Sequence, residues 1–507
     1  MGARACSRER GSLAIDHPRA WSRLDWAALA AVTLGGAALR LVGLARPVGL
    51  VFDEIFYAQN ACQYVLGGAE CGIAELAGRS HPPLGNWLIG IGIRIFGYNE
   101  FGWRITAALA GALTIGLLYL LVRRLLAGRV SEGAATVGSF SAAGLLAIDF
   151  LHLVQSRMAM LDVFVTLFVV TAVLFTVLDV TRDRGPGARG WWIRLTLGRP
   201  WRLLTGVSLG AAVGVKWSGA YAGLLVVALL IAWETAASRE GHEDDGDRQS
   251  WWGAFAAAAR REAPRSLVLL GLVPLIIYVA SYIGRIPGAG LGLPWVDGTF
   301  LHEVWEHQGR MLRFHVGLGG NHPYESPAWS WLLDKRPVAY YFRVDDGAYR
   351  HILALGNPLA WGAGGVAVIG LGAAWVRDGM RLARPEPVLL GAVAATYLPW
   401  LLLTASRSFV FIWYLLPTVP FLCAGLGLVA AHAWRGVPGR VAVVLAGAVL
   451  IASFAFFFPV LTALRISPDD WRMRIWFSDC ARPDAPTLEL PDDVIDNGPP
   501  PVGWCWI

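Results

Sequence analysis

The stretch "DWAALAAVTLGGAALRLVGL" occupies residues 25–44 and decides the class of fold. Its length matches the roughly 20 apolar residues that an α-helix needs to cross a bilayer. Comparable blocks recur along the 507 residues, of which 55% are hydrophobic and only 16% are charged. Soluble domains are about one quarter charged, and the mean hydropathy here is +0.50. The sequence therefore predicts an all-α polytopic membrane protein.

Eleven apolar segments qualify as transmembrane helices in windows of about 19 residues. The expected spans are 25–45, 101–123, 133–150, 161–180, 202–216, 218–236, 266–284, 356–376, 387–404, 408–430 and 440–462. The first of them is too long for the apolar core of a cleavable signal and lacks a small-residue cleavage site. We therefore expect it to remain as a membrane anchor.

Clusters of arginine predict the orientation of these spans. They occur in residues 1–24 and in the loops after every second span, all on the N-terminal side of the membrane. Cytoplasmic loops carry an excess of Lys and Arg, so this side is expected to be cytoplasmic. The same rule explains the net charge of +6 without a nucleic-acid partner. The outer side then holds the segments 46–100 and 285–350 and the tail 463–507.

The cysteines agree with this topology. Cys62 and Cys71 fall in the first outer segment, and Cys480 and Cys505 fall in the outer tail. In an oxidising compartment these four residues could form two local disulfides. Four free thiols are the alternative, because pairing does not follow from sequence alone.

Two adjacent carboxylates, Asp53 and Glu54, follow the first span in "GLVFDEIFYAQNACQYV" (49–65). One interpretation is a solvated helix N-terminus, where acidic residues complement the helix dipole. Their neighbours Phe52, Ile55 and Phe56 favour another. Desolvation by apolar groups raises the pKa of a carboxyl, which suits a general base.

Several cations gather at the predicted outer membrane surface: Arg104, Arg157, Lys216 and Arg407. Cations at this depth suit an anionic lipid head group such as a polyprenyl phosphate, with its tail between helices. Two alternatives, in which the arginines form purely structural ion pairs, stay open. Arg104 could pair with an outer carboxylate for structural reasons, and Arg157 could pair with Asp162, five residues away.

The remaining outer features each have two interpretations. The apolar stretch after His81 is about 14 residues long and suggests an interfacial helix or a buried packing helix. Aromatic residues of 285–350, including Trp305 and Tyr340, suit sugar stacking or an interfacial belt. His302 and Glu306 are spaced for one helix face, but no recognised zinc spacing is present, and we expect no metal site.

Five motifs follow one another in the order of a known family: "FDEIFYA" (52–58), "HPPLGNWLIGIG…FGYNEFGWRI" (81–105), "SRMAMLDVFV" (156–165), "GVKWSGAYAG" (214–223) and "NHPYESPAWSWLLDKRPVAYY" (321–341). Together they resemble the bacterial protein O-mannosyltransferases, in their actinobacterial form, over essentially the whole chain. The resemblance implies a GT-C glycosyltransferase fold of about eleven helices, with 25–462 as the catalytic membrane domain.

The resemblance also implies a polyprenyl-phosphate-mannose donor, used at the outer face of the plasma membrane. The implied acceptors are Ser and Thr of exported proteins, with the Sec translocon as a partner. Asp53 and Glu54 match the family's essential acidic pair, and Arg104 matches the arginine that opens the second span. Asn86 stands where the family pattern leads us to expect a lysine.

The implied reaction inverts the sugar linkage, because the donor is β-linked and the product is α-linked. We assign Asp53 as the base and Glu54 as the residue that binds or orients the acceptor, and an exchange of these roles fits the sequence equally well. We assign the leaving phosphate to a cationic set made up of Arg104, Arg157 and Lys216, with His81 and Arg407 as further candidates. No cofactor is implied besides the lipid-linked donor, and a divalent-metal requirement stays open.

Two rival functions remain at this point. A sister GT-C enzyme would share the acidic loop and the cations but glycosylate a lipid or a cell-wall glycan. A transporter would place ionisable residues at mid-span and use broken helices. Here the candidate residues lie at the outer ends of the spans, which favours an enzyme.

Overall fold

The computed structural model describes residues 21–72, 80–181, 199–244, 250–284, 298–317, 324–382, 384–403 and 410–476. The long helices are α1 (Arg23–Leu41), α5 (Glu100–Leu126), α6 (Glu132–Ala147), α8 (Asp162–Val180), α10 (Pro200–Val215), α11 (Ala220–Asp244), α12 (Trp251–Ser266), α14 (Phe300–Gly317), α15 (Pro358–Arg377), α16 (Glu386–Leu403), α17 (Val419–Ala433) and α18 (Val437–Leu461).

Shorter elements connect and cap these helices. They are α2 (Glu54–Val65), α3 (Gly68–Cys71), α4 (Leu84–Phe96), α7 (Phe150–Ser156), η1 (Trp217–Gly219), η2 (Leu267–Leu272), α13 (Val273–Ala280), η3 (Ala328–Leu333), β1 (Val338–Asp345), β2 (Ala348–Ala354), η4 (Ile412–Thr418) and α19 (Pro468–Arg472).

The expectation of a polytopic helical membrane protein is confirmed. Each of the eleven expected spans coincides with a helix, and nine helices within the described ranges are long and apolar enough to cross a membrane. The pair α6 and α7, bent by 60°, makes a tenth if it forms one span, and α10 has only 16 residues. One boundary differs, because the helix expected at 266–284 already begins at Trp251.

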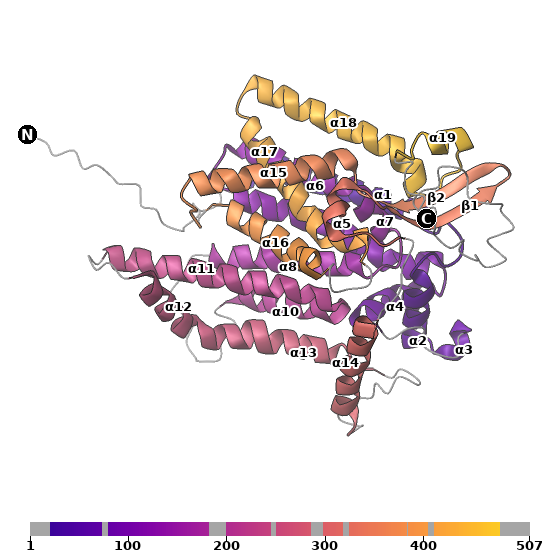
Figure 1. Ribbon diagram of the computed structural model, residues 1–507, viewed down its shortest axis with the longest axis horizontal. Helices are drawn as coiled ribbons and strands as arrows, with labels where there is room; N and C mark the ends of the chain where they lie inside the picture. The colour runs from indigo at the N-terminus through magenta and orange to yellow at the C-terminus, as the bar shows by residue number, and fades with distance from the viewer. Residues whose placement is uncertain are drawn as a thin grey trace, which may run out of the picture.

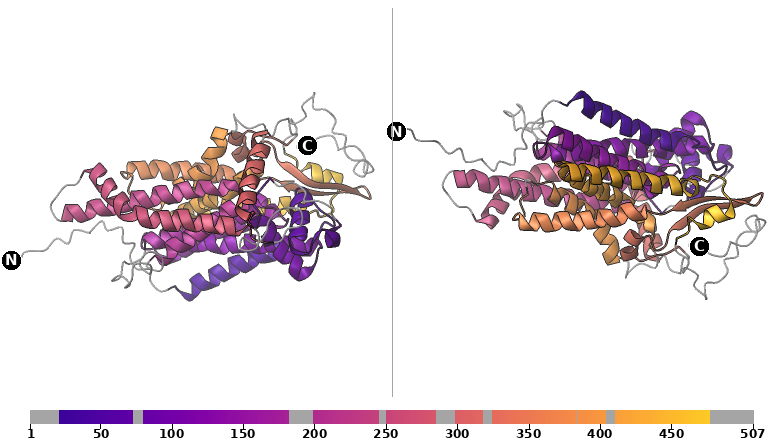
Figure 2. Two further views of the ribbon diagram at one scale, coloured as in Figure 1. Left: turned by 90° about the horizontal axis from the view of Figure 1, so that it is seen from below. Right: turned by 90° about the horizontal axis from the view of Figure 1, so that it is seen from above.

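The spans run side by side along the long axis of the molecule, as Figures 1 and 2 show. Helix α5 lies among them and packs against α1, α6 and α8. Close approach depends on small residues, as is usual between membrane helices. A Cβ on Gly138 of α6 would lie 2.7 Å from the carbonyl oxygen of Gly427 on α17, so only glycine fits at this crossing.

The helices α2, α3, α4 and α14 gather with the two strands at one end of this bundle (Figure 1). Cys62 of α2 is bonded to Cys71 of α3, which decides for a disulfide over free thiols in this segment. Cys480 and Cys505 lie outside the described residues. Helix α4 packs one face on α2 and α5 and leaves Ile91 exposed, so it is at least a packing helix, and its place at the interface stays a prediction.

The all-α prediction is wrong for residues 338–354, which form an antiparallel hairpin of β1 and β2. Asp346 (φ +46°) and Gly347 (φ +73°) form its two-residue turn, the geometry that an Asp-Gly pair favours. The register shifts between Ala339 and Tyr341, which makes Tyr340 the extra residue of a β-bulge. Bulges redirect side chains and are frequent beside active sites.

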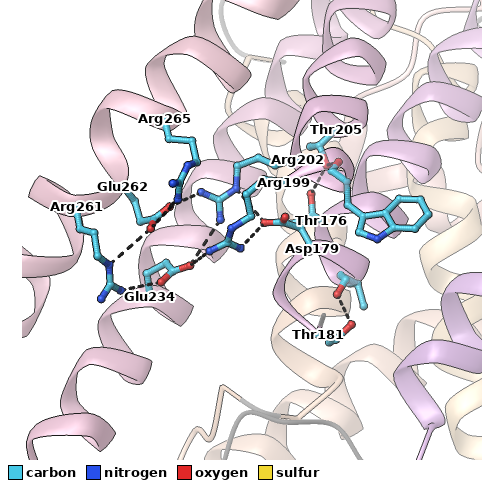
Figure 3. A network of polar contacts seen from close by, with 12 residues as sticks. Thr176, Asp179, Thr181, Arg199, Arg202, Thr205, Glu234, Arg261, Glu262 and Arg265 are labelled. Atoms are coloured by element: carbon cyan, nitrogen blue, oxygen red, sulfur yellow. Dashed lines mark hydrogen bonds and ion pairs between the residues drawn. The ribbon is translucent and has the colours of Figure 1, made fainter. Parts of the chain in front are cut away.

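The opposite end of the bundle holds a network of buried charges (Figure 3). Arg202 is 1% exposed and bonds to Asp179 at 2.9 Å and to Glu262 at 2.7 Å. Arg199 bonds to Asp179 at 3.1 Å, and Arg261 bonds to Glu234 at 3.0 Å. These ion pairs join the last turn of α8 and the start of α10 to α11 and α12.

Candidate active site

The chain enters the site through a strained residue. Phe52 has φ +49°, a left-handed conformation that an aromatic L-residue rarely adopts. Its ring stacks on Tyr340 with the centroids 4.2 Å apart and meets Trp413 edge-on at 5.3 Å. Such strain costs on the order of 1–3 kcal/mol and persists where the surroundings impose it. The aromatic contacts therefore hold the following residue, Asp53, in a set position.

Asp53 occupies the N-cap of α2, yet its side chain makes no capping bond to the helix. The Tyr57 hydroxyl donates to the Asp53 carboxyl instead. Burial raises the pKa of Asp53 to about 6, and the charge of Lys216 opposes this rise while that of Asp162 adds to it. The carboxyl is only partly exposed. A carboxyl with these properties can take up a proton near neutral pH.

Glu54 is the adjacent carboxylate, and it is fully buried. Arg104 donates to both of its oxygens, from Nε and from Nη2, at 2.8 Å each. The backbone N–H groups of Val51 and Ala159 each donate to it at 3.0 Å. Because both carboxylate oxygens are already occupied, the prediction that Glu54 binds the acceptor does not fit this geometry.

Arg104 is equally occupied. Besides Glu54, its guanidinium donates to the carbonyl oxygens of Leu44 (3.3 Å), Pro47 (2.8 Å) and Gly49 (3.0 Å). A guanidinium has five N–H donors, and these contacts use all of them. Arg104 therefore holds the 44–54 loop to α5, which favours the structural ion pair over the predicted phosphate contact.

Arg157 also binds backbone rather than an open site. Its guanidinium donates to the carbonyl oxygens at the end of α1 and just beyond it, those of Leu39, Arg40, Val42 and Gly43, at 2.8–3.0 Å. The last carbonyls of a helix have no partner within the helix, and a cation there is favourable. The alternative of an ion pair between Arg157 and Asp162 is wrong, since Asp162 has a different partner.

Lys216 is that partner. Its Nζ lies 2.9 Å and 3.0 Å from the two oxygens of Asp162, and 4.5 Å from the ring centroid of Tyr414. Lys216 ends α10 and Asp162 begins α8. The pair therefore lies at the membrane edge, as expected for Lys216. An ammonium has three N–H donors, so two bonds to Asp162 leave one donor for a ligand.

His81 lies on the same side of the site. Its ring is 6.1 Å from that of Tyr57 and 5.5 Å from that of His315. His315 contacts the carbonyl oxygen of Ser80 at 2.9 Å. The structure thus places His81 beside Tyr57 at the edge of the candidate site. Arg407 lies outside the described residues.

Three tyrosines complete the site: Tyr57, Tyr340 and Tyr414. Of these, the sequence singled out only Tyr340, as an aromatic residue suited to sugar stacking or to an interfacial belt. The charges of Asp53 and Asp162 act on Tyr57 and on Tyr340, whose pKa values are raised first by burial and then by these carboxylates. The Tyr340 hydroxyl accepts a bond of 2.6 Å from Gln155. The β-bulge at Tyr340 could have marked this residue as functional, but a bulge can be identified only after the hairpin itself is recognised.

The described residues include no group of three or more His, Cys, Asp or Glu placed to hold a metal ion. His302 and Glu306 do pair, with Nε2 and Oε1 3.3 Å apart, but on an exposed face of α14. A single exposed pair of this kind is typical of a helix-surface ion pair.

Known proteins are similar to this chain in sequence over most of its length. A family model described as "Dolichyl-phosphate-mannose-protein mannosyltransferase" matches residues 96–258, and one described as "C-terminal four TMM region of protein-O-mannosyltransferase" matches residues 300–480. The polyprenol-phosphate-mannose–protein mannosyltransferase of Mycobacterium tuberculosis is 33% identical over 473 residues, covering 84% of this chain and 85% of the relative. The chain belongs to the protein O-mannosyltransferase family.

Two further similarities agree with this assignment. The enzyme of the same name from Mycolicibacterium smegmatis is 31% identical over 504 residues, covering 89% of this mannosyltransferase and 92% of the relative. In structure, the chain is similar to the Saccharomyces cerevisiae protein O-mannosyltransferase Pmt1–Pmt2 complex bound to the sugar donor. The TM-score is 0.70 at 15% identity, covering 90% and 92% of the two chains. The predicted family and GT-C fold are confirmed, and the protein is a multi-pass membrane mannosyltransferase.

Proposed function

We propose that this protein O-mannosyltransferase moves mannose from polyprenol-phosphate-mannose to Ser and Thr hydroxyls of exported proteins, with inversion at the sugar carbon. The names of the mycobacterial relatives support the lipid donor and the protein acceptor. The observation that carries the chemistry is the placement of Asp53, a partly buried carboxyl, within the influence of the Lys216–Asp162 ion pair.

In the proposed step, the acceptor hydroxyl oxygen attacks the anomeric carbon while Asp53 takes the hydroxyl proton. The bond between that carbon and the phosphate oxygen breaks, and polyprenyl phosphate leaves with the electron pair. General-base assistance contributes about 10²–10⁴-fold. Lys216 stabilises the charge that develops on the phosphate, and Asp162 keeps the ammonium in place.

Glu54, Arg104 and Arg157 act in this proposal as positioning residues. Arg104 ties the loop before Asp53 to α5 through Glu54 and three carbonyl oxygens. Arg157 fixes the end of α1, where that loop begins. Together they keep the Asp53 backbone from shifting, which matters because a small displacement of a base costs much of the rate. His81 and Arg407 stay candidates for contact with the donor.

For the orientation, we propose that the site faces the outside of the plasma membrane and that the N-terminus is cytoplasmic. The far ends of the spans carry arginines such as Arg124 in the last turn of α5 and Arg199 and Arg202 in the buried network. An excess of basic residues is typical of cytoplasmic ends. The loops 46–100 and 285–350 and the tail 463–507 then meet acceptors emerging from the Sec translocon.

The reaction is tested with membranes that contain the protein, radiolabelled polyprenyl-phosphate-mannose and a Thr-rich peptide. We expect label in the peptide, released by an α-mannosidase, since inversion of a β-linked donor gives an α-linked product. Label confined to the lipid or glycan fraction would contradict the protein acceptor and favour a sister GT-C activity.

A further inference from the structure

Helix α14 has three distinct faces. One face packs against the protein and contains the buried residues Phe300, Val304 and Met311. A second is charged and contains His302, Glu306, Arg310 and Arg313. The third is apolar and exposed, with Leu301 at 69%, Trp305 at 76%, Leu312 at 55% and Val316 at 78% exposure. These four residues follow at intervals of four, seven and four, so they share one face of the helix.

The packing face holds α14 firmly to the end of α13. Phe300 and Val304 form an apolar cluster with Tyr282, which is fully buried. The Tyr282 hydroxyl accepts a bond of 3.0 Å from Gln308 Nε2 and lies 3.1 Å from His307 Nδ1. The apolar face is therefore exposed on a helix whose rotation is already set by other contacts.

Helix α14 runs across the spans rather than along them. Figure 1 shows it roughly perpendicular to α11 and α13 and projecting from the side of the bundle, and the left view of Figure 2 agrees. Because those helices cross the bilayer, α14 lies parallel to the membrane plane. It lies at the end of the bundle that holds the candidate active site.

The apolar face of α14 is continuous with a surface that faces lipid. A groove of about 510 Å³ separates α13 from the start of α14, and its lining includes Leu275, Ile276, Val279 and Leu301. Leu275 and Ile276 belong to the span Trp251–Ala280 and are 56% and 54% exposed. Exposed leucine and isoleucine on a span contact acyl chains. Leu301 joins that surface to the rest of the apolar face.

We propose that α14 is an in-plane membrane anchor whose Leu301, Trp305, Leu312 and Val316 face is embedded in the outer surface of the bilayer. A helix with one apolar face and one charged face, lying parallel to the membrane, inserts to a depth of about 5–10 Å. Trp305 suits this level, since tryptophan is enriched at the membrane interface. Arg310 and Arg313 on the charged face then reach the lipid phosphates.

The anchor has a direct connection to the site. His315, in the last turn of α14, contacts the Ser80 carbonyl oxygen at 2.9 Å, and its ring lies 5.5 Å from that of His81. The ring of Trp217, next to Lys216, is 6.1 Å from His315. The depth of α14 in the bilayer therefore helps to set how far His81 and Trp217 lie from the membrane surface.

Spin labels on single cysteines test the anchor directly. The full chain, with Cys6, Cys480 and Cys505 replaced by Ser, is labelled at position 305 or 312 of the apolar face or at 306 or 313 of the charged face. It is then reconstituted in vesicles of phosphatidylethanolamine and phosphatidylglycerol. Collision rates with oxygen, which concentrates in lipid, and with a water-soluble nickel chelate are measured by power saturation. Thermal unfolding of each variant in detergent controls for folding.

The proposal predicts that labels replacing Trp305 and Leu312 collide mainly with oxygen. Labels replacing Glu306 and Arg313 should collide mainly with the nickel chelate. Nickel collisions as frequent at 305 and 312 as at 306 would place the apolar face in water and overturn the anchor. Low rates with both reagents at 305 and 312 would show instead that a second copy or another protein covers this face. None of these outcomes depends on the proposed transfer reaction.

Discussion

Glu54 and Arg104 form a bidentate ion pair across 50 residues of sequence, with two N–H···O contacts of 2.8 Å and both side chains fully buried. Three loop carbonyl oxygens and two backbone N–H groups complete the arrangement. The pair therefore ties the loop that carries Asp53 to the first turns of α5. The neighbouring carboxyl, that of Asp53 at the start of α2, makes neither a capping bond to the helix nor an ion pair with another described residue.

Substitution of Arg104 by Ala is expected to destabilise the protein. Removing one partner of a buried ion pair leaves an uncompensated charge and costs about 3–5 kcal/mol. Thermal unfolding in detergent should show a clear fall in Tm together with the loss of activity. Arg104→Lys should not restore it, because three N–H donors replace five.

The control for this prediction is Arg343→Ala, since Arg343 is an exposed arginine on β1. It should leave Tm unchanged. If Arg104→Ala instead kept the wild-type Tm and weakened only the use of donor, Arg104 would contact the phosphate and the positioning role would be wrong.

The pH dependence of transfer is expected to report Asp53. Burial raises the pKa of this carboxyl to about 6, and only the ionised form can accept a proton. The kcat/KM value should therefore rise with pH through about 6 and level off above it. Lys216 lowers the pKa of Asp53, so Lys216→Met should move this rise to higher pH.

Lys216→Met should also weaken transfer about tenfold to a hundredfold, the value of a charge-assisted contact of roughly 1.5–3 kcal/mol. Arg343→Ala again serves as a control and should leave the pH profile in place. A profile that does not move in Lys216→Met would show that Lys216 is too far from Asp53 to act as proposed.

Composition was enough to predict the spans, because the bilayer requires about 20 apolar residues for each helix. It was not enough for the hairpin. Residues 338–354 alternate weakly, and the Asp346–Gly347 turn signal lies inside the expected outer segment 285–350. With the hairpin missed, the bulge at Tyr340 and its stacking on Phe52 could not be foreseen.

The sequence also did not predict which residues pair with the buried charges. Arg157 was expected to pair with Asp162, five residues away, or with phosphate. The turn between α7 and α8 separates the two side chains, and Asp162 bonds to Lys216 across 54 residues. Spacing predicts contacts within one helix, but helix packing decides which cation meets which carboxylate. The acidic pair itself was identifiable because two charges stand among aromatic residues after a span.

The orientation of the membrane protein can be tested at two exposed aspartates. Asp346 lies in the turn of the hairpin, at the end of the bundle that holds the candidate site, and Asp378 follows α15. With Cys6, Cys480 and Cys505 replaced by Ser, a cysteine at 346 should react with an impermeant maleimide in intact cells. A cysteine at 378 should react only after permeabilisation. The reverse pattern would contradict the proposed topology.

A separate comparison decides between the two adjacent carboxylates. Glu54→Gln should lower both Tm and transfer, since it weakens four hydrogen bonds in a buried site. Asp469→Asn, the same type of change at an exposed residue of α19, should alter neither. Loss of transfer in Glu54→Gln with an unchanged Tm would exchange the roles of Glu54 and Asp53.

The most direct test of the central claim is the transfer rate of Asp53→Asn in membranes, at equal protein level. The asparagine keeps the size of the side chain and can still meet the Tyr57 hydroxyl, but it cannot take up the acceptor proton. Since general-base assistance contributes about 10²–10⁴-fold, mannosyl transfer to a Thr-rich peptide should fall at least a hundredfold. Donor binding, followed with a photoreactive polyprenyl phosphate, should persist. A turnover close to that of the wild type would contradict the assignment of Asp53 as the base.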